Sequence, residues 1–245
     1  MNERFGVQYI RFYDDNFTVD KNRVIDICDE IIKRGLQIKW RCESRIDGTD
    51  REMLQKMADA GCHEIEYGIE TGSEKVMKNI NKRIKLEKVP EVVQMCKDCG
   101  LEAKAFIMIG LPGETIKDFR KTIEISKIFD YCGVAQLMIF PGSPLYEDMK
   151  SKKRIDDNIW FETNLSDSEI FKDVPIYTDS FSEELSMKLK AIFFEQHPNY
   201  SRHMNLFKRI LKSINFKDLF KPQILARKLK SYRDYRRTRN DIFGK

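Results

Sequence analysis

The sequence has no long apolar run and few histidines. No apolar stretch approaches the ~18 residues that a membrane-spanning helix needs. The first residues, MNERFGVQYI, lack the basic-then-apolar pattern of a signal peptide, so we expect an intracellular, cytoplasmic protein. The three histidines, His63, His197 and His203, do not have the spacing of a metal-binding pair, and we treat them as ordinary residues.

Two common nucleotide-binding motifs are also missing. The chain contains neither a GxGxxG after its first strand-like segment nor a GxxxxGK[ST], which argues against a dinucleotide-binding or P-loop domain. Six cysteines are scattered along the chain: Cys28, Cys42, Cys62, Cys96, Cys99 and Cys132. In an intracellular protein, thiols distributed in this way are expected to be buried or free rather than paired in disulfides.

Charge is plentiful but uneven. The 245 residues include 44 Lys and Arg against 39 Asp and Glu, a net charge of +5. Residues 200–245 hold 14 basic and three acidic residues, so the tail carries +11 and the remainder −6. Such a tail, with apolar residues between its cations, suits docking on an anionic membrane surface or a solvated helical extension; nucleic acid is disfavoured because no recognition fold accompanies it.

Five strand-like segments alternate with helix-like segments in the first 146 residues. The strand-like segments lie within residues 7–17, 38–45, 64–73, 103–114 and 134–146. Helix-like stretches follow Asp20, Asp50, Lys85 and Thr115. This alternation predicts an α/β fold with a parallel sheet and right-handed crossovers. Runs such as FIMIG and QLMIF are apolar on both faces, as a doubly covered sheet requires.

Four segments carry a resemblance to the radical S-adenosylmethionine (radical SAM) superfamily, and most of all to its members with an N-terminal cobalamin-binding domain. They are FYDDNFTVD, RCESRID followed by MLQKMADAGCHEIEYGIETGSEKVMKNINK, FIMIGLPGET and FPGSPLYE. The resemblance implies a partial (β/α) barrel over residues 1–150, with five β/α units and the first strand missing. An irregular and helical cap would follow at 151–199 and a basic helical tail at 200–245.

The resemblance also implies a chemistry. In such enzymes a CxxxCxxC loop holds a [4Fe-4S] cluster, which reduces S-adenosylmethionine to a 5′-deoxyadenosyl radical. This sequence contains no CxxxCxxC, and its close pair, Cys96 and Cys99, cannot provide three converging thiolates. We therefore expect the C-terminal part of a radical SAM enzyme, whose cluster ligands lie elsewhere in the full-length parent and which alone binds no cluster.

Candidate cofactor-binding residues follow from the resemblance, and each has a structural alternative. Gly110, Pro112, Gly113 and Glu114 would carry the motif that packs along the adenine and ribose of S-adenosylmethionine; the alternative is a plain strand-to-helix turn. Phe140 and Pro141 would lie beside the adenine ring, or simply close an apolar strand end. Trp40 and Tyr67 are expected to fill the core, and no catalytic residue is assigned.

The earlier strand ends supply polar candidates. Glu70 and Thr71 would meet the ribose hydroxyls or the methionine group, or cap a helix. Asp14 and Asp15 would attract the methionine amine, or act as turn formers. Arg45 would pair with Glu70 or with the methionine carboxylate, or form an internal ion pair.

The leading functional hypothesis is a radical SAM enzyme for cobalamin-dependent methyl transfer or ring formation. Its substrate would be a hydrophobic small molecule, lipid-like or a tetrapyrrole. One alternative is a degenerate barrel that acts as a partner module and associates through the sheet edge left open by the missing strand. Another is a cobalamin-free enzyme of the methylthiotransferase or coproporphyrinogen-oxidase type.

Overall fold

The computed structural model describes residues 6–155, 175–197, 199 and 222–244. The chain divides into two compact units. The first unit contains residues 1–107, 117–134 and 197–199, and the second contains residues 108–116, 135–196 and 200–245. Residues 156–174 of the predicted cap and 200–221 of the predicted tail lie outside the described residues. The predicted boundaries near residues 150 and 199 stay a prediction.

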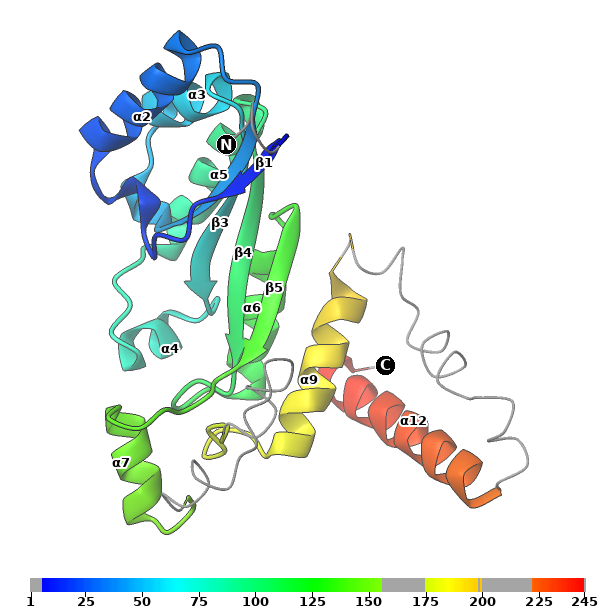
Figure 1. The fold of residues 1–245 in the computed structure, drawn as a ribbon. Helices are drawn as coiled ribbons and strands as arrows, with labels where there is room; N and C mark the ends of the chain where they lie inside the picture. Colours follow the sequence, from blue (N-terminus) through cyan, green and yellow to red (C-terminus); the bar gives the residue numbers. More distant parts are fainter. Residues whose placement is uncertain (1–5, 156–174, 198, 200–221, 245) are drawn as a thin grey trace. The chain divides into compact units, whose positions relative to one another are not determined.

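A five-stranded sheet has the order β1-β2-β3-β4-β5, which is also the order of the strands along the chain (Figure 1). The strands are β1 Tyr9–Arg11, β2 Lys39–Ser44, β3 Cys62–Glu70, β4 Glu102–Ile109 and β5 Tyr131–Gln136. The pairs β1–β2, β2–β3 and β3–β4 are parallel. The predicted alternation of strands with crossover helices is therefore confirmed.

Helices connect successive strands. They are α2 Lys21–Lys33, α3 Arg51–Asp59, α4 Glu74–Asn79, α5 Val89–Asp98 and α6 Ile116–Ser126, with single turns η1 Phe17–Val19, η2 Ile46–Gly48 and η3 Leu86–Lys88. The predicted starts of the first two long helices are confirmed, since the Asp20 carboxylate accepts from the backbone N–H of Arg23 and Asp50 from that of Met53. The short α4 was not predicted from the sequence.

The two faces of the sheet differ in polarity. In Figure 1, α2, α3 and α5 lie over one face. The side chains of Trp40, Ile65 and Tyr67 on that face are completely buried. Alternate residues point the opposite way because successive side chains in a strand change face. They include charged residues on β2 and β3 at the centre of the sheet, so these two strands have one apolar and one polar face.

The second unit contains three described helices, α7 Pro144–Ser151, α9 Glu183–Gln196 and α12 Pro222–Phe243. The end of α12 packs on α9: Tyr235 is 6% exposed and donates to Glu195, and the Arg239 guanidinium lies 3.0 Å from the same carboxylate. No helix among the described residues is long and apolar enough to cross a membrane. Docking of the basic tail on anionic lipid stays a prediction.

His197 is buried in the first unit. Its Nε2 lies 3.1 Å from the Ser126 carbonyl oxygen and 3.5 Å from the Cys132 thiol, and the side chain is 0% exposed. Burial lowers the pKa of His197, although the hydrogen bond to the Ser126 carbonyl opposes this shift. The imidazole therefore resists protonation in the folded protein.

The lowered pKa of His197 predicts an acid-sensitive fold. Because the unfolded chain binds this proton at a higher pH, the free energy of unfolding should fall as pH drops through ~6.5 and level off below the folded pKa. In His197→Gln, the free energy of unfolding should fall less between about pH 7 and pH 5 than it does in the unmodified protein. Urea unfolding at both pH values measures this, with His63→Gln as the control. An unchanged pH slope in His197→Gln would contradict the assignment.

Candidate functional site

The ends of β1 and β2 are joined by the side chain of Asn16, which follows Asp14 and Asp15 in the chain. The Asn16 amide oxygen accepts from the backbone N–H of Arg45 at 3.2 Å. Asp14, a predicted cofactor residue, is paired with Arg23 at 2.7 Å. Asp15 is exposed and forms no ion pair among the described residues. Of the two adjacent carboxylates, Asp15 alone is thus available to a ligand amine.

Arg45 and Glu70 do not pair with each other. Arg45 makes a bidentate pair with Asp47, with Nε–Oδ1 at 3.0 Å and Nη2–Oδ2 at 2.8 Å. Glu70 is held instead by Lys82, whose Nζ lies 2.8 Å from Oε1. The internal ion pair that the sequence left open for Arg45 is therefore formed, but with a near neighbour in the chain.

Glu70 and Lys82 form a partly buried ion pair at the end of β3. Glu70 has a positive φ of 65°, an uncommon conformation for a residue other than glycine. Gly68 lies beneath the pair, since a Cβ added there would come 2.9 Å from the Glu70 carboxylate and 3.0 Å from Lys82 Nζ. Both charged side chains are about one-fifth exposed. The carboxylate is thus fixed at the strand end and still reachable by a ligand.

Thr71 lies in a buried hydrogen-bond network and not on the surface. Its hydroxyl lies 3.2 Å from that of Thr122 on α6, which also accepts from the backbone N–H of Gly72 at 2.9 Å. Ser73 donates to Asp118 at 2.6 Å. All four side chains of the network are at most 5% exposed. This network fixes the turn that follows Glu70, so Thr71 positions Glu70 and is itself closed to a ligand.

The loop Gly110–Glu114 of the second unit is held by hydrogen bonds to one of its own carboxylate oxygens. One oxygen of the buried Glu114 carboxylate accepts from the backbone N–H groups of Gly110 at 2.7 Å and Leu111 at 3.2 Å. Gly110 and Gly113 have φ values of 88° and 72°, which only glycine adopts readily. Glu114 therefore shapes the loop, while half-buried Pro112 and exposed Gly113 form its outer surface.

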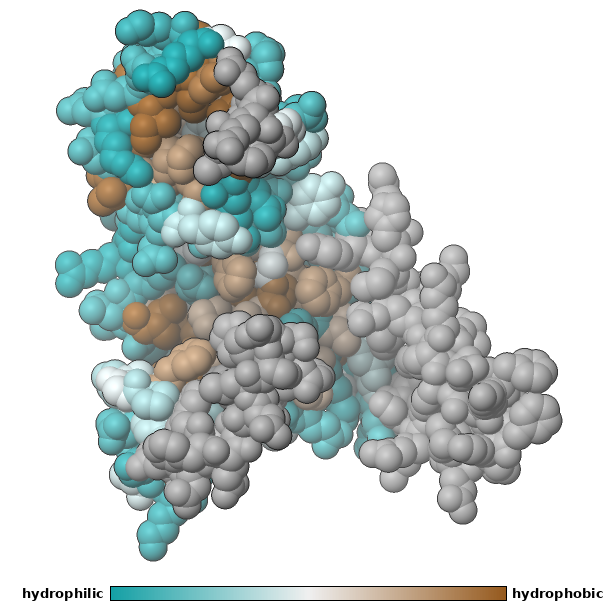
Figure 2. All heavy atoms as spheres, viewed as in Figure 1, coloured by the Kyte–Doolittle hydropathy of each residue, from teal (hydrophilic) through white to brown (hydrophobic). Residues whose placement is uncertain are grey.

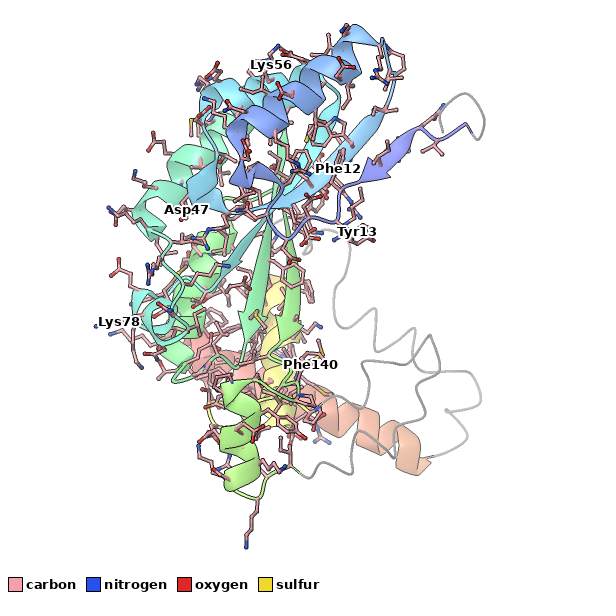
Figure 3. All side chains as sticks on the ribbon, turned by 60° about the vertical axis from the view of Figure 1, so that its left-hand side comes forward. Phe12, Tyr13, Asp47, Lys56, Lys78 and Phe140 are labelled. Carbon is pink, nitrogen blue, oxygen red and sulfur yellow. The ribbon has the colours of Figure 1, made fainter. Side chains whose placement is uncertain are left out.

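The end of β5 leads to exposed apolar residues. Phe140, labelled in Figure 3, is 43% exposed, and Pro141 is exposed as well. Ser143 donates to the Phe140 carbonyl at 2.8 Å and caps α7. The buried Nε2 of Gln136, the last residue of β5, has no hydrogen-bond partner in the described part of the chain. Sequence reasoning missed Gln136, although its place at a strand end was a signal.

The face of the sheet opposite the helices carries a chain of charges. Glu43 and Glu66 stand opposite each other on β2 and β3. Arg11 lies 2.5 Å from Glu43 and 3.9 Å from Glu66, and Lys104 lies 3.0 Å from Glu66. The Glu66 side chain is only 7% exposed, so its charge needs these cations. Exposed Phe106 lies on the same face of β4. This face is therefore charged on β2 and β3 and carries an exposed aromatic ring on β4.

The six cysteines do not form a cluster site. All are free and buried, and no group of three metal-ligating side chains exists among the described residues. Burial raises the pKa of Cys28 and Cys96 to about 11 and that of Cys132 to about 12. These residues therefore do not fit an iron–sulfur cluster, which takes deprotonated thiolates that converge.

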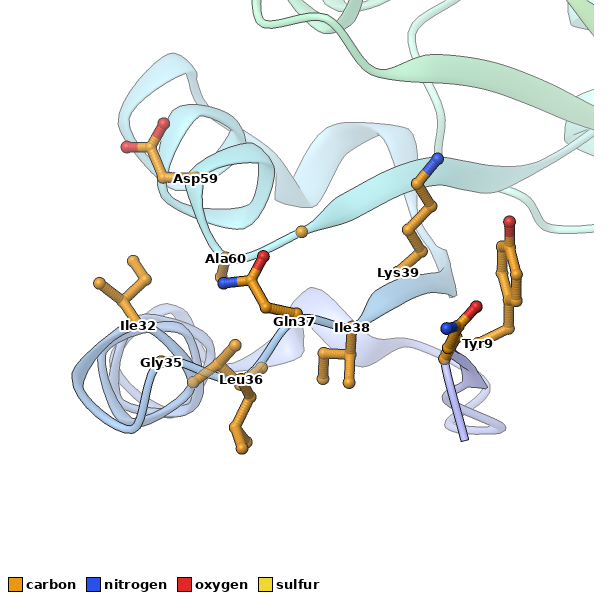
Figure 4. A pocket seen from close by; sticks show the side chains of 12 residues that line it. Tyr9, Ile32, Gly35, Leu36, Gln37, Ile38, Lys39, Asp59 and Ala60 are labelled. Atoms are coloured by element: carbon orange, nitrogen blue, oxygen red, sulfur yellow. The ribbon is translucent and has the colours of Figure 1, made fainter. Parts of the chain in front are cut away.

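One hollow of the first unit lies at the opposite ends of its strands. It measures about 480 Å³ and lies at the amino ends of β1 and β2, between Tyr9, Leu36 and Ala60 (Figure 4). Figure 2 shows hydrophobic residues gathered at this end of the unit. Active sites of β/α barrels lie at the carboxyl ends of the strands. We therefore place the candidate site at the strand ends and not in this hollow.

The thiols predict slow labelling. At about pH 8 a thiol with a pKa near 11 is almost entirely protonated, and the thiolate is the reactive form. Ellman's reagent should label the native protein only slowly and should reach all six cysteines in denaturant. Fast labelling of one or more cysteines in the native protein would contradict the buried arrangement.

The hydrogen bonds between Thr71, Gly72 and Thr122 predict that a substitution of Thr122 lowers the stability of the fold. Thr122→Val keeps the volume but removes the oxygen that accepts from Gly72, leaving the half-buried backbone N–H of Gly72 without this partner. The free energy of unfolding should fall by about 1–3 kcal/mol. Thr122→Ser, which keeps the hydroxyl, should cost less than Thr122→Val in urea unfolding. The reverse order would show that the methyl group, and not the hydrogen bond, fixes the turn.

Comparison with known proteins places this geometry in a family. A family model described as the radical SAM superfamily matches residues 1–125. An uncharacterized methyltransferase of Pyrococcus horikoshii is 34% identical over 150 residues, which cover 60% of this chain and 32% of that protein. An anaerobic magnesium-protoporphyrin IX monomethyl ester cyclase of Rubrivivax gelatinosus is 25% identical over 159 residues, covering 63% and 29%. The chain thus spans about a third of the length of these relatives.

The fold comparison agrees. The radical S-adenosylmethionine methyltransferase TsrM from Kitasatospora setae, solved with cobalamin and a [4Fe-4S] cluster, superposes with a TM-score of 0.54 at 17% identity. The superposition covers 60% of this chain and 29% of that one. The sheet with its outer helices is accordingly a partial (β/α) barrel of the radical SAM type. Because the family model matches more than half of the chain, this protein belongs to the radical SAM superfamily.

Proposed function

We propose that this chain forms the S-adenosylmethionine-facing part of a radical SAM enzyme that transfers a methyl group or closes a ring on a hydrophobic small molecule. The observation that carries the proposal is the fixed carboxylate of Glu70 at the end of β3, in a chain of this superfamily. S-adenosylmethionine, when bound, supplies a sulfonium whose carbon–sulfur bond can be cleaved by one electron.

The residues present fit S-adenosylmethionine. A carboxylate accepts hydrogen bonds from paired ribose hydroxyls, and Glu70 is held in place for this by Lys82 and by its own strand-end conformation. Exposed Asp15 offers a negative charge to the amine of the methionine group. Gln136 and Phe140 belong to the second unit, where the buried Nε2 of Gln136 has no hydrogen-bond partner among the described residues and Phe140 is exposed.

The motif residues divide into contact and positioning roles in this proposal. Glu70 and Asp15 of the first unit are accessible and would touch the cofactor, while a contact from Phe140 and Pro141 of the second unit stays a prediction from the resemblance. Thr71 and Glu114 are buried and would fix the loops that carry the contacts. Arg45, already paired with Asp47, would orient the strand end and not bind the methionine carboxylate.

The cluster and cobalamin enter the proposal differently from S-adenosylmethionine. Since the cysteines of this chain do not fit a cluster, its thiolates would come from polypeptide outside these residues, and we derive no step through it. Cobalamin is proposed because TsrM, whose fold this chain shares, was solved with it. A tetrapyrrole is the proposed kind of substrate because the cyclase of Rubrivivax gelatinosus acts on a magnesium-protoporphyrin ester.

Binding of S-adenosylmethionine tests the proposal directly. The purified chain should bind it weakly but saturably in isothermal titration calorimetry, without any cluster. Glu70→Gln should weaken binding by about tenfold, the effect of losing one charge-assisted hydrogen bond of ~1.4 kcal/mol. Glu87→Gln, at an exposed position on η3, is the matched control and should leave binding unchanged. Absence of saturable binding, or equal binding by Glu70→Gln, would refute the proposed role.

A further inference from the structure

A second hollow lies outside the residues assigned so far, at the carboxyl end of β2. It measures about 470 Å³ and is enclosed by the η2 turn, the start of α3 and the segment that leads through η3 into α5. Asp47, labelled in Figure 3, lies on one side of it. All of its lining residues belong to the first unit. Its volume is in the range of small-molecule sites.

The floor of this hollow is apolar. Ile46, Ile84 and Val92 line it and are 2%, 7% and 7% exposed. Met95 on α5 adds a half-buried, flexible side chain. Such a floor favours the non-polar part of a ligand, because covering it removes apolar surface from water. A purely inorganic ion would leave this surface uncovered.

The rim carries cations without carboxylate partners. Arg83, Lys85 and Lys88 all line the hollow, are exposed, and form no ion pair within the described ranges. Lys82, the residue just before Arg83, differs from these three because its Nζ forms an ion pair with Glu70 at 2.8 Å. Glu87 lies among these residues in the chain but does not line the hollow, so the cations of the lining keep a surplus of positive charge that a bound anion would offset.

The carboxylates facing these cations are mostly engaged elsewhere. Asp47 accepts both hydrogen bonds of the Arg45 guanidinium, and Asp50 is bound by Lys21 at 2.8 Å and caps α3. Lys21 lowers the pKa of Asp50, so that carboxylate stays ionised and paired. Glu91 is the one remaining acid of the lining, against three cations. The free charge at the rim is therefore positive.

We propose that this hollow binds an organic phosphate, with its phosphoryl oxygens on Arg83, Lys85 and Lys88 and its non-polar part on the floor formed by Ile46, Ile84, Val92 and Met95. The planar guanidinium of Arg83 suits bidentate contact with a phosphoryl group, and the two ammonium groups add point charges. A neutral ligand would make no use of the cations, and a simple anion would make no use of the floor. The proposal is independent of the function proposed above.

Binding of α-naphthyl phosphate to the full chain, followed by calorimetry at low salt, is the test. It should bind at least about tenfold more tightly than inorganic phosphate, which lacks the non-polar part, and than α-naphthol, which lacks the phosphoryl group. Arg83→Gln/Lys85→Gln/Lys88→Gln should weaken binding of α-naphthyl phosphate by about tenfold or more. Circular dichroism of the variants checks that the exposed substitutions leave the fold intact.

A matched variant separates a site from general charge. Lys117→Gln/Arg120→Gln/Lys121→Gln removes the same number of positive charges from exposed positions on α6 and should leave binding within about twofold. Met95→Gln should weaken α-naphthyl phosphate but not inorganic phosphate. Equal loss in both triple variants would overturn the proposal, as would equal affinity for inorganic phosphate, equal affinity for α-naphthol, or no binding of α-naphthyl phosphate.

Discussion

Burial of one face of the parallel sheet is the interaction on which the other features of the first unit depend. Trp40, Ile65 and Tyr67 are completely buried on that face, and each large apolar side chain contributes about 1.5–3 kcal/mol. The exposed ion pairs of the unit contribute about 0–1 kcal/mol each. The apolar face therefore determines the register of β2 and β3. Because side chains alternate, the same register places Glu43 and Glu66 together on the opposite face.

The charged face follows from this constraint at some cost. Two carboxylates directly opposite each other on neighbouring strands are unfavourable, and the buried one, Glu66, is the more costly. Arg11 and Lys104 offset the cost from β1 and β4. A sheet selected only for stability would have apolar residues here, since replacing buried ion pairs by packed apolar groups is often neutral or stabilising. Stability alone therefore does not explain the charges on this face.

The local parts of this arrangement could be predicted from the sequence. Asp20 and Asp50 were predicted to begin helices and do so, because an N-cap interacts with backbone two or three residues away. The partner of Glu70 could not be predicted, since Lys82 reaches it only once α4, itself unpredicted, has folded between them. Arg45 found Asp47, two residues away, in preference to any distant carboxylate.

The polarity of the sheet was predictable in part. The alternation in EIEY, residues 64–67, indicates one polar and one apolar face, whereas the run FIMI in β4 is apolar at every position. In that run, Phe106 is 40% exposed while its neighbour Ile107 is fully buried. An aromatic side chain on the open face looks the same in sequence as one in a core. Only the register of β4 against β3, which pairs Phe106 with Gly68, distinguishes the two.

The cations of the segment from Lys82 to Lys88 lie in two different places. Lys82 contacts Glu70 beside β3, while Arg83 and Lys85 line the hollow beside β2. Buried Ile84 anchors the segment between them. The charge of Lys82 is therefore offset by a carboxylate within the fold, whereas the charges of Arg83 and Lys85 are not.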